Sequence, residues 1–313
     1  MNALLKTAAR YAQGLIDKPG FIRSMYEDNH ARLFDYAEYM AVTNIKKIEI
    51  EDGRVIMTTR DRGIRIACGA GDYRIAPIET LNFKDYEKAE SSMMENLVED
   101  GDNFFDIGAN IGWYSINIAA SRPQTQVYSF EPLPKTYRQL ETNVGLNAVP
   151  NVRLHHFGFS NQAGSSPFYY YAQGSGNASS ANLTDRPDVE VVQCSVRTLD
   201  GYIAAEGTRL DFVKCDVEGA ELLVFQGGQQ TIARDKPIVF SEILRKWSAK
   251  FNYDPNDIFL LFRQLGYKAF TAENGSLIEF TTMTADTVQT NFFFLHAEKH
   301  RHQIARYQTQ GNA

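Results

Sequence analysis

The chain has 313 residues, of which 43% are hydrophobic, and this length and composition suffice for a large buried core. The length predicts one domain of about 200 to 250 residues with an appended segment. The 32 Lys and Arg residues against 38 Asp and Glu residues give a net charge of −6. This balance offers no general attraction to nucleic acid or to an anionic membrane surface, so we expect neither as a partner.

The cysteines and the N-terminal residues indicate the cellular compartment in which we expect the protein. Cys68, Cys194 and Cys215 are far apart and match neither a disulfide framework nor the spacing of a metal site, which indicates a reducing compartment. No apolar run near residue 1 has the length that a signal peptide or a membrane span needs. We therefore expect a cytoplasmic protein with no membrane insertion.

Residues 1–82 are predicted to form an extension of helices and a β-hairpin. Apolar residues recur at helical spacing from Leu4 to Met40, with a break at Pro19-Gly20, which predicts two helices. Two β-rich runs, 45–50 and 54–59, flank Asp52-Gly53, and Asp-Gly is a strong hairpin signal. We expect any homo-oligomer to form through this N-terminal region.

Residues 83–300 are predicted to form the main domain, with a tail over 301–313. Strand-like and helical runs alternate there, which is typical of an α/β, Rossmann-like, mostly parallel sheet with helices on both faces. Seven strands are expected, at 104–107, 127–130, 152–157, 210–215, 238–243, 267–271 and 291–296. Helices are expected near 111–121, 134–146, 219–230 and 255–265. The Gly- and Ser-rich stretch 158–198 interrupts this rhythm and predicts a long loop or hairpin insertion.

A glycine-rich turn follows the first of these strands. It reads Asp106-Ile107-Gly108-Ala109-Asn110-Ile111-Gly112, and its glycines allow a ligand to approach the backbone. A dinucleotide fingerprint needs glycine at its first, third and sixth positions, but Asn110 and Trp113 occupy the last two. The turn therefore argues against NAD or FAD. We expect Asp106 to organise the turn and to help bind an amino group; a generic tight turn is the alternative.

A second acidic residue ends the next expected strand. Glu131 lies 25 residues after Asp106, near the spacing of about 20 at which α/β cofactor sites place an acid against a ribose diol. An acid that merely favours a helix N-terminus is the alternative. Together with the glycine turn, the spacing favours Glu131 as a ribose ligand.

Acidic residues also gather at two later strand ends. Asp216, Glu218 and Glu221 lie within six residues, and such carboxylates repel each other unless a cation, a proton or hydrogen bonds compensate. We expect one of them only to favour the first turn of the next helix. Glu242 stands inside an apolar run and is expected to point into a cleft, with a water-facing edge position as the alternative.

Two adjacent histidines are weaker candidates for a catalytic role than the acidic residues. His155 and His156 are neighbours on an expected strand, so only one of them can face a given side of the sheet. Packed histidines are the favoured interpretation, and a role as a base stays open.

The combined pattern resembles the FkbM family of methyltransferases. The resemblance covers about 90–297 and rests on four ordered motifs: Asp-Ile-Gly-Ala-Asn-Ile-Gly at 106–112, Phe-Glu-Pro at 130–132, Asp-Val-Glu-Gly-Ala-Glu at 216–221 and Ser-Glu-Ile at 241–243. It implies S-adenosylmethionine as the donor, the class I methyltransferase fold with its last strand antiparallel, and O-methylation of sugar or polyketide hydroxyls. The cofactor-binding residues that it implies are Asp106, Gly108, Ala109, Asn110, Gly112, Glu131 and Ser160, with Asn161 as the alternative to Ser160.

An alcohol acceptor needs a base, because its pKa is very high. We expect a carboxylate of Asp216, Glu218 or Glu242 in this role. No metal ligands are assigned, although the same acids could instead hold a divalent cation that lowers the pKa of the acceptor. A non-catalytic nucleoside-binding protein and a dehydrogenase are the rival functions, and the missing third glycine disfavours the second.

Overall fold

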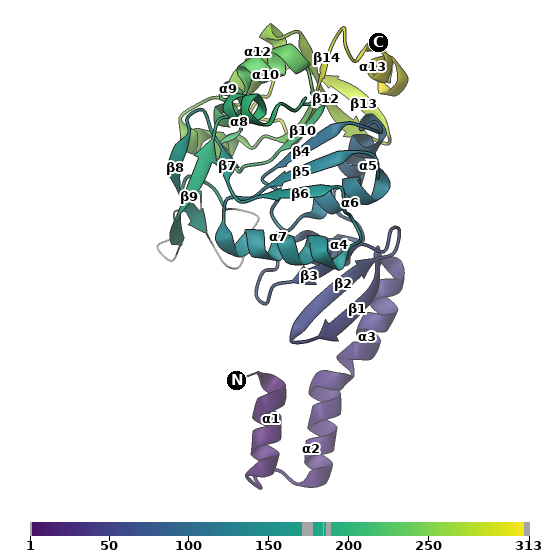
Figure 1. The fold of residues 1–313 in the computed structure, drawn as a ribbon. Helices are drawn as coiled ribbons and strands as arrows, with labels where there is room; N and C mark the ends of the chain where they lie inside the picture. The colour runs from purple at the N-terminus through teal and green to yellow at the C-terminus, as the bar shows by residue number, and fades with distance from the viewer. Residues whose placement is uncertain (1, 171–177, 184, 186–188, 310–313) are drawn as a thin grey trace.

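The computed structural model describes residues 2–170, 178–183, 185 and 189–309 (Figure 1). Its centre is an eight-stranded sheet in the order β13-β12-β14-β11-β10-β4-β5-β6. The strands are β4 (Asn103–Ile107), β5 (Gln126–Phe130), β6 (Val152–His155), β10 (Phe212–Cys215), β11 (Ile238–Glu242), β12 (Tyr267–Glu273), β13 (Ser276–Phe280) and β14 (Asn291–His296). From β11 to β6 all pairs are parallel, whereas β14 pairs antiparallel with both β11 and β12.

This sheet confirms the expected α/β fold. All seven predicted strands are present, the last of them antiparallel. The eighth strand, β13, forms a hairpin with β12 through Asn274 and Gly275, which have φ of 50° and 77°. Asn-Gly is the preferred pair for such a two-residue turn, so the sequence carried a signal for this strand that the prediction did not use.

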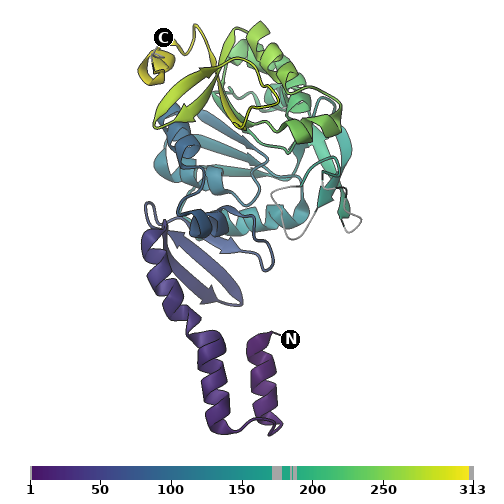
Figure 2. The same cartoon turned by 180° about the vertical axis from the view of Figure 1, so that it is seen from behind.

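Helices cover both faces of the sheet (Figures 1 and 2). One core packs the sheet against α5 (Lys88–Leu97), α6 (Trp113–Ser121) and α13 (Arg301–Tyr307). The other packs it against α8 (Leu199–Glu206), α9 (Glu221–Gln226), α10 (Gln229–Asp235) and α12 (Asn256–Gln264). Neighbouring residues of β4 enter opposite cores, Phe104 the first and Phe105 the second. The central strands are therefore apolar on both faces, as buried parallel strands must be.

The predicted helices begin and end close to their expected bounds. The segment 134–146 is one helix, α7 (Pro134–Leu146), whereas 219–230 contains α9 and the start of α10. The segment 301–313, expected as a tail, begins with helix α13, whose Ile304 is buried. No helix among the described residues is both long and apolar enough to cross a membrane.

The insertion at 158–198 forms a small sheet of its own. Its strands are β7 (Gly158–Phe159), β8 (Gly164–Tyr170) and β9 (Glu190–Arg197), in the order β7-β9-β8. Strands β8 and β9 are antiparallel, so the insertion is a hairpin that packs beside the carboxyl edge of the main sheet. A short helical segment, α11 (Arg245–Ser248) and η4 (Ala249–Phe251), follows β11.

The N-terminal extension contains the predicted helices and hairpin. Helix α1 (Ala3–Ala12) is followed by a helical rod made of α2 (Lys18–Met25), the π-helical turn η1 (Tyr26–His30), α3 (Arg32–Tyr39) and η2 (Met40–Val42). The break between the helices precedes Pro19 rather than falling on it: Asp17 caps the rod by accepting from Gly20 N at 2.9 Å. Proline is favoured in the first turn of a helix, so Pro19-Gly20 opens the second helix.

A three-stranded sheet connects the rod to the main domain. Strands β1 (Ile45–Glu51) and β2 (Arg54–Thr59) form the expected hairpin, and β3 (Arg65–Cys68) adds a third strand. Helix α4 (Ala76–Phe83) then leads into α5. Asn143 of α7 and Asn147, the residue after it, bond to the β3 backbone, which fixes this small sheet to the main domain.

Candidate functional site

The turn after β4 is held open by backbone geometry. Gly108, Asn110 and Gly112 have φ of 76°, 48° and 93°, and the amides of Gly108 and Ala109 both donate to Phe130 O at 3.1 and 3.0 Å. A Cβ on Gly108 would lie 1.9 Å from the carbonyl oxygen of Asp216. Only glycine fits there, and the turn lies directly against the loop that follows β10.

Gly112 has a different task from Gly108. A Cβ on Gly112 would lie 2.6 Å from Leu140 Cδ1 of α7 and 3.3 Å from Ile116 Cδ1. The residue therefore faces the core and allows α6 and α7 to approach each other, whereas Gly108, Ala109 and Asn110 line the cavity described below.

Asp106 lies beneath the turn, fully buried. Its Oδ2 accepts hydrogen bonds from Ser115 N at 3.1 Å and from Ser115 Oγ at 2.6 Å, which fixes the start of α6. Its Oδ1 lies 3.3 Å from Lys214 Nζ. This position organises the turn, as expected; the second part of the expectation, contact with a ligand amino group, stays a prediction.

Lys214 is a site residue that the sequence analysis missed. It lies on β10 with its side chain buried, and its Nζ donates to Gly108 O at 2.8 Å and lies 3.4 Å from Asp216 Oδ2. Burial alone would lower the pKa of this ammonium, but the carboxylates of Asp216 and Asp106 outweigh burial and raise it. A lysine inside the apolar run Phe-Val-Lys-Cys was the available signal, because a buried cation needs partners.

Glu131 stands beside the glycine turn at the end of β5. Its Oε2 accepts from Asn110 N at 3.1 Å and its Oε1 accepts from Leu133 N at 2.9 Å. Burial raises its pKa to about 7 against the opposing effect of these two hydrogen bonds. Each carboxylate oxygen keeps a further lone pair, so the geometry leaves room for the predicted contact with a diol.

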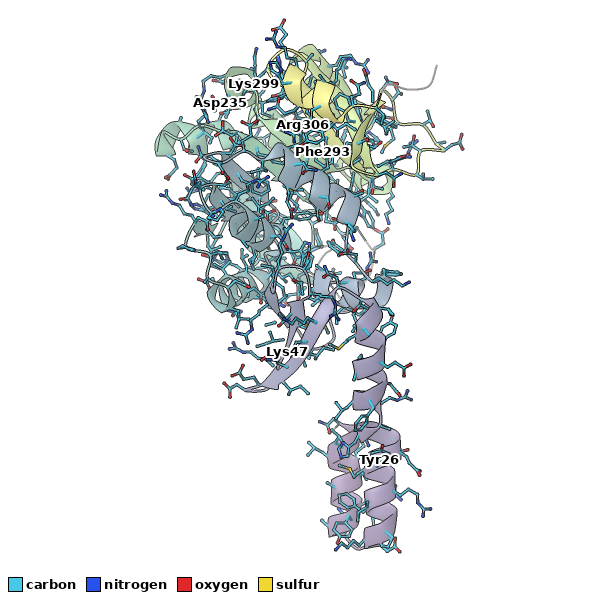
Figure 3. All side chains as sticks on the ribbon, turned by 90° about the vertical axis from the view of Figure 1, so that its right-hand side faces the viewer. Tyr26, Lys47, Asp235, Phe293, Lys299 and Arg306 are labelled. Atoms are coloured by element: carbon cyan, nitrogen blue, oxygen red, sulfur yellow. The ribbon has the colours of Figure 1, made fainter. Side chains whose placement is uncertain are left out.

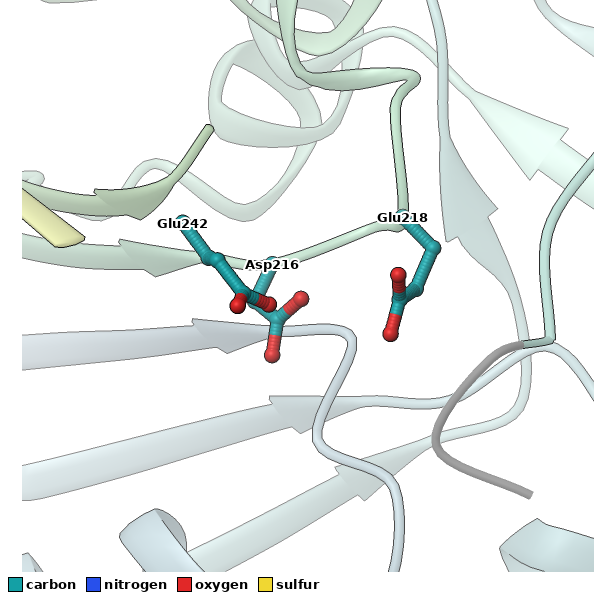
Figure 4. A group of neighbouring side chains, drawn as sticks. All are labelled: Asp216, Glu218 and Glu242. Carbon is teal, nitrogen blue, oxygen red and sulfur yellow. The ribbon is translucent and has the colours of Figure 1, made fainter. Parts of the chain in front are cut away.

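Asp216, Glu218 and Glu242 come together at the carboxyl ends of β10 and β11 (Figure 4). One carboxylate oxygen from each residue lies within 4.8 Å of the others. Burial and the charge of Asp216 raise the pKa of both Glu218 and Glu242 well above its ordinary value. Oδ1 of Asp216 and Oε2 of Glu218 are buried and have no hydrogen-bond partner among the described residues.

Glu221 is the acid of this loop that has a structural role. Its Oε1 accepts from Val217 N at 3.1 Å and from Gly219 N at 2.9 Å, and its Oε2 accepts from Tyr253 OH at 3.3 Å. These bonds hold the turn in which Glu218 adopts φ of 54°. The expectation that one of the three acids only serves the helix start fits Glu221, which is the first residue of α9.

A cavity of about 350 Å³ lies between the glycine turn, the acids and the segment before α5. It is lined by five carboxyl groups and three cationic groups: Glu79, Glu87, Asp216, Glu218, Glu242, Arg74, Lys214 and Lys246. Two smaller hollows continue from it across the sheet edge, and Gly108 borders all three. Glu131 lines the nearer hollow, and Ser160 the farther one together with Phe159 and Val217.

Glu87 is the second residue that the sequence analysis missed. It precedes α5 with φ of 41° and accepts a hydrogen bond from Tyr114 OH of α6. Burial is the main cause that raises its pKa to about 7, and Asp216 adds to it. Since Glu87 lies far from the strand ends in sequence, no local pattern places it beside Asp216.

The two histidines are packed side chains. His155 stacks on Phe130 at a centroid distance of 4.8 Å, and its Nε2 lies 3.1 Å from Tyr202 OH. His156 stacks on Tyr137 at 4.5 Å. Neither borders the cavity among the acids.

A known protein family matches the part of the sequence that forms this site. The model of the FkbM methyltransferase domain matches residues 106–269, which is more than half of the chain. The chain belongs to the FkbM methyltransferase family. The matched residues of this FkbM protein run from Asp106 at the glycine turn into β12, and they include Lys214 and the three clustered acids.

Curated relatives share part of this FkbM protein. The AMB antimetabolite synthetase AmbE of Pseudomonas aeruginosa is 33% identical over 39% of the chain and 7% of AmbE. Methyltransferase 1 of Beauveria bassiana is 28% identical over 39% of the chain and 56% of its own length. The 2-O-methyltransferase NoeI of Sinorhizobium fredii is 27% identical over 42% of the chain and 59% of its own length. The chain thus spans less than two thirds of each of these relatives.

Solved structures resemble it at low identity. A crystal structure of an FkbM methyltransferase from Methylobacillus flagellatus is 16% identical, with a TM-score of 0.42 over 87% of this chain and 60% of that one. A precorrin-6y C5,15-methyltransferase from Geobacter metallireducens is 10% identical, with a TM-score of 0.37 over 67% of this chain and 87% of that one.

Proposed function

We propose that this FkbM protein is an S-adenosylmethionine-dependent O-methyltransferase whose acceptor is a hydroxyl group of a sugar or glycan. The observation that carries the proposal is the convergence of Asp216, Glu218 and Glu242 beside the glycine turn after β4, on one cavity. Open α/β sheets bind ligands at this edge, so donor and acceptor groups would meet next to the acids.

The residues of the turn fit such a donor. Gly108, Ala109 and Asn110 line the cavity, and Oδ1 of Asn110 is buried with no hydrogen-bond partner among the described residues. These residues and the backbone of the turn over Asp106 would hold the methionine moiety of S-adenosylmethionine. Glu131 would hold the ribose hydroxyls and Ser160 would border the adenine, in line with the hollows that these residues line.

When bound, S-adenosylmethionine supplies a methyl group already activated for in-line displacement. The protein therefore has to position the acceptor hydroxyl and remove its proton. Glu242 ends β11 and lines the cavity, and burial together with Asp216 raises its pKa, which makes its carboxylate a stronger base. We assign proton removal to this cluster, with Glu242 as the first candidate and Asp216 and Glu218 as the others.

The walls of the cavity favour a polar acceptor. Tyr86 and Trp113 border both this cavity and a second one of about 470 Å³. The second cavity is lined mainly by charged and amide groups: Asn44, Asp61, Arg62, Lys84, Asp85, Lys88, Glu95 and Asn117. Aromatic faces beside many hydrogen-bonding groups suit a molecule with several hydroxyls, so we favour a sugar over a polyketide.

The test is transfer of a labelled methyl group to a panel of sugars, oligosaccharides and polyketide alcohols. Glu242→Gln should lower kcat by about 10²-fold or more, while the affinity for S-adenosylmethionine measured by calorimetry stays the same. Glu206→Gln, at an exposed carboxyl group on α8, is the matched control and should keep full turnover. Full turnover in both Glu242→Gln and Asp216→Asn, with normal donor binding, would contradict the assignment.

Two further measurements test the alternatives, a bound divalent cation and a protein without catalytic activity. The three acids could hold a divalent cation instead of acting as a base, and exhaustive chelation would then abolish transfer. Unchanged activity after chelation would exclude the cation. Tight donor binding without transfer to any member of the panel would favour the rival function, a non-catalytic nucleoside-binding protein.

A further inference from the structure

The helical part of the N-terminal extension projects away from the rest of the molecule (Figures 1 and 2). We call residues 3–42 the stalk, residues 3–25 (α1 and α2) its tip, and residues 26–42 (η1, α3 and η2) its shaft. None of the helices in this described range contains a buried residue. Figure 3 shows side chains that project from the stalk, where Tyr26 is labelled, and Tyr26 is exposed.

Much of the exposed apolar surface of the protein lies on the stalk. Eleven of the nineteen large hydrophobic side chains that are exposed in the described part of the chain belong to it: Leu4, Leu5, Tyr11, Leu15, Ile22, Tyr26, Leu33, Phe34, Tyr36, Tyr39 and Val42. Exposed apolar side chains concentrated on one element are typical of an interaction site.

Few side-chain contacts join the stalk helices to each other or to the body in the described residues. Tyr11 stacks on Phe21 at 4.6 Å between α1 and α2, and Tyr39 OH donates to Asn82 O at 3.3 Å at the base. Helices shorter than about 12–15 residues are marginal in water without tertiary packing. α1 has 10 residues, and none of the stalk helices contains a buried residue, so packing within the chain adds little to their stability and a covering surface would stabilise them.

The charges of the stalk are separated along its length. The tip carries four cationic residues against one anionic residue: Lys6, Arg10, Lys18 and Arg23 against Asp17. The shaft carries four anionic residues against one cationic residue: Glu27, Asp28, Asp35 and Glu38 against Arg32. The tip of one stalk is therefore complementary to the shaft of another, and the stalk as a whole has no excess of either sign.

We propose that the stalk is covered by the stalk of a second copy of this chain. Two stalks lie antiparallel about a two-fold axis, so that each basic tip packs along the acidic shaft of the other copy. A two-fold axis repeats every tip-to-shaft contact, and one complementary pair of surfaces therefore serves both copies. A balanced charge argues against an anionic membrane as the occupant, because amphipathic helices that bind such membranes are rich in Lys and Arg.

The test is the mass of the full chain by sedimentation equilibrium, with charge reversals on the stalk. The wild type should be a dimer at about 10 μM. Reversal of the tip (K6E/R10E/R23E) and reversal of the shaft (E27K/D35K/E38K) should each raise the dissociation constant at least about tenfold, because like charges then face each other. Both reversals in one chain restore complementarity and should restore the dimer.

Matched variants separate the interface from charge or folding effects. D100K/D286K reverses two exposed acids outside the stalk and should leave the dimer intact. L33S/F34S removes apolar contact on α3 and should also raise the dissociation constant, with unchanged thermal unfolding of the main domain.

Three results would overturn the proposal. They are a monomeric wild type up to about 100 μM, equal weakening by both single reversals without recovery in the combined variant, and binding to phosphatidylcholine–phosphatidylserine vesicles by a monomer.

Discussion

Lys214 compensates the buried negative charge of the site. Its ammonium group lies within 3.4 Å of both Asp106 and Asp216 and also holds the carbonyl group of Gly108. Buried carboxylates without such a partner are costly, since their charge leaves water for a medium of low polarity. The same side chain therefore supports the fold of two loops and the charge balance of the cavity.

Substitution of this lysine tests that balance. Lys214→Met should lower the free energy of unfolding by about 3–5 kcal/mol, because it removes the cation beside the buried carboxylate of Asp106 and the partly buried one of Asp216. Lys268→Met is the matched control: the Lys268–Glu279 pair is exposed, and its loss should change stability by less than about 1 kcal/mol. Urea unfolding followed by circular dichroism measures both, and equal effects of the two substitutions would contradict the role of Lys214.

Glu87 predicts a pH dependence of stability. Burial raises its pKa to about 7, whereas the unfolded carboxyl group titrates near 4.5. Between these values the folded state binds more protons than the unfolded state, so stability falls as the pH rises from about 4.5 through about 7. Glu87→Gln removes this pH dependence. The free energy of unfolding of the variant, relative to that of the wild type, should therefore rise by about 1–3 kcal/mol between pH 5 and pH 8.

Urea unfolding of both proteins at the two pH values measures the difference. If the free energy of unfolding changed equally in the variant and the wild type between pH 5 and pH 8, Glu87 would not titrate in this range. Glu79→Gln is the control, because Glu79 borders the same cavity but pairs with Arg74 at 3.4 Å.

Sequence reasoning found the residues of the site that belong to contiguous motifs. Asp216, Glu218 and Glu242 follow apolar strands, and carboxyl ends of adjacent parallel strands meet at one edge. Glu87 was missed because Asp216, which raises its pKa, lies 129 residues away in the sequence. Lys214 was missed because two of its partners, Gly108 and Asp106, lie 106 and 108 residues away, and only Asp216 is local. A local pattern carries no information about such partners.

At the scale of elements, two loops form the site as a unit. The turn after β4 and the loop after β10 touch where Gly108 faces the carbonyl group of Asp216. Glu221 holds the second loop from inside with bonds to Val217 N and Gly219 N. The acids are thus placed by backbone geometry, and a small change in one loop displaces the other.

Gly108→Ala tests this contact. The new Cβ would meet backbone oxygen at 1.9 Å and would sit at φ of 76°, so we expect a loss of about 2–4 kcal/mol in stability and loss of donor binding. Gly145→Ala is the control, since Gly145 lies in α7 with open space around it and should gain up to about 1 kcal/mol. Thermal unfolding with and without S-adenosylmethionine measures both effects. Normal donor stabilisation in Gly108→Ala would refute the proposed cradle.

The elements themselves followed from the sequence where burial dictates composition. The central strands are apolar on both faces, and this pattern located all seven predicted strands. The third strand of the N-terminal sheet, β3, has only four residues and no alternation strong enough to distinguish it. Pro19 was misread because the same residue breaks a helix interior and favours a helix start.

At the scale of the whole molecule, the protein combines a well-packed body with a bare stalk. The body has two large cores, one on each face of its sheet. The stalk has none in its described residues. Its stability should therefore depend on association, whereas that of the body should not.

Hydrogen exchange measured at two protein concentrations tests this difference. At about 1 μM the amides of α1 and α2 should exchange close to the rate of an unfolded chain, and at about 100 μM they should be protected. Amides of β4 and β10 serve as the internal control and should exchange slowly at both concentrations. Strong protection of the stalk at the lower concentration would show that it is stable alone.

The base of the stalk has a mechanical consequence. Val42 and Asn44, at the base of the stalk, line the second cavity together with Arg62 and Lys84. The rod from Lys18 to Val42 is about 37 Å long at 1.5 Å per residue, and its last residue borders this cavity. A rotation of a few degrees at Val42 would move the other end of the rod by several ångströms. If a molecule bound in this cavity changed the orientation of the rod, then binding of a partner at the far end would change the affinity for that molecule by the same free energy.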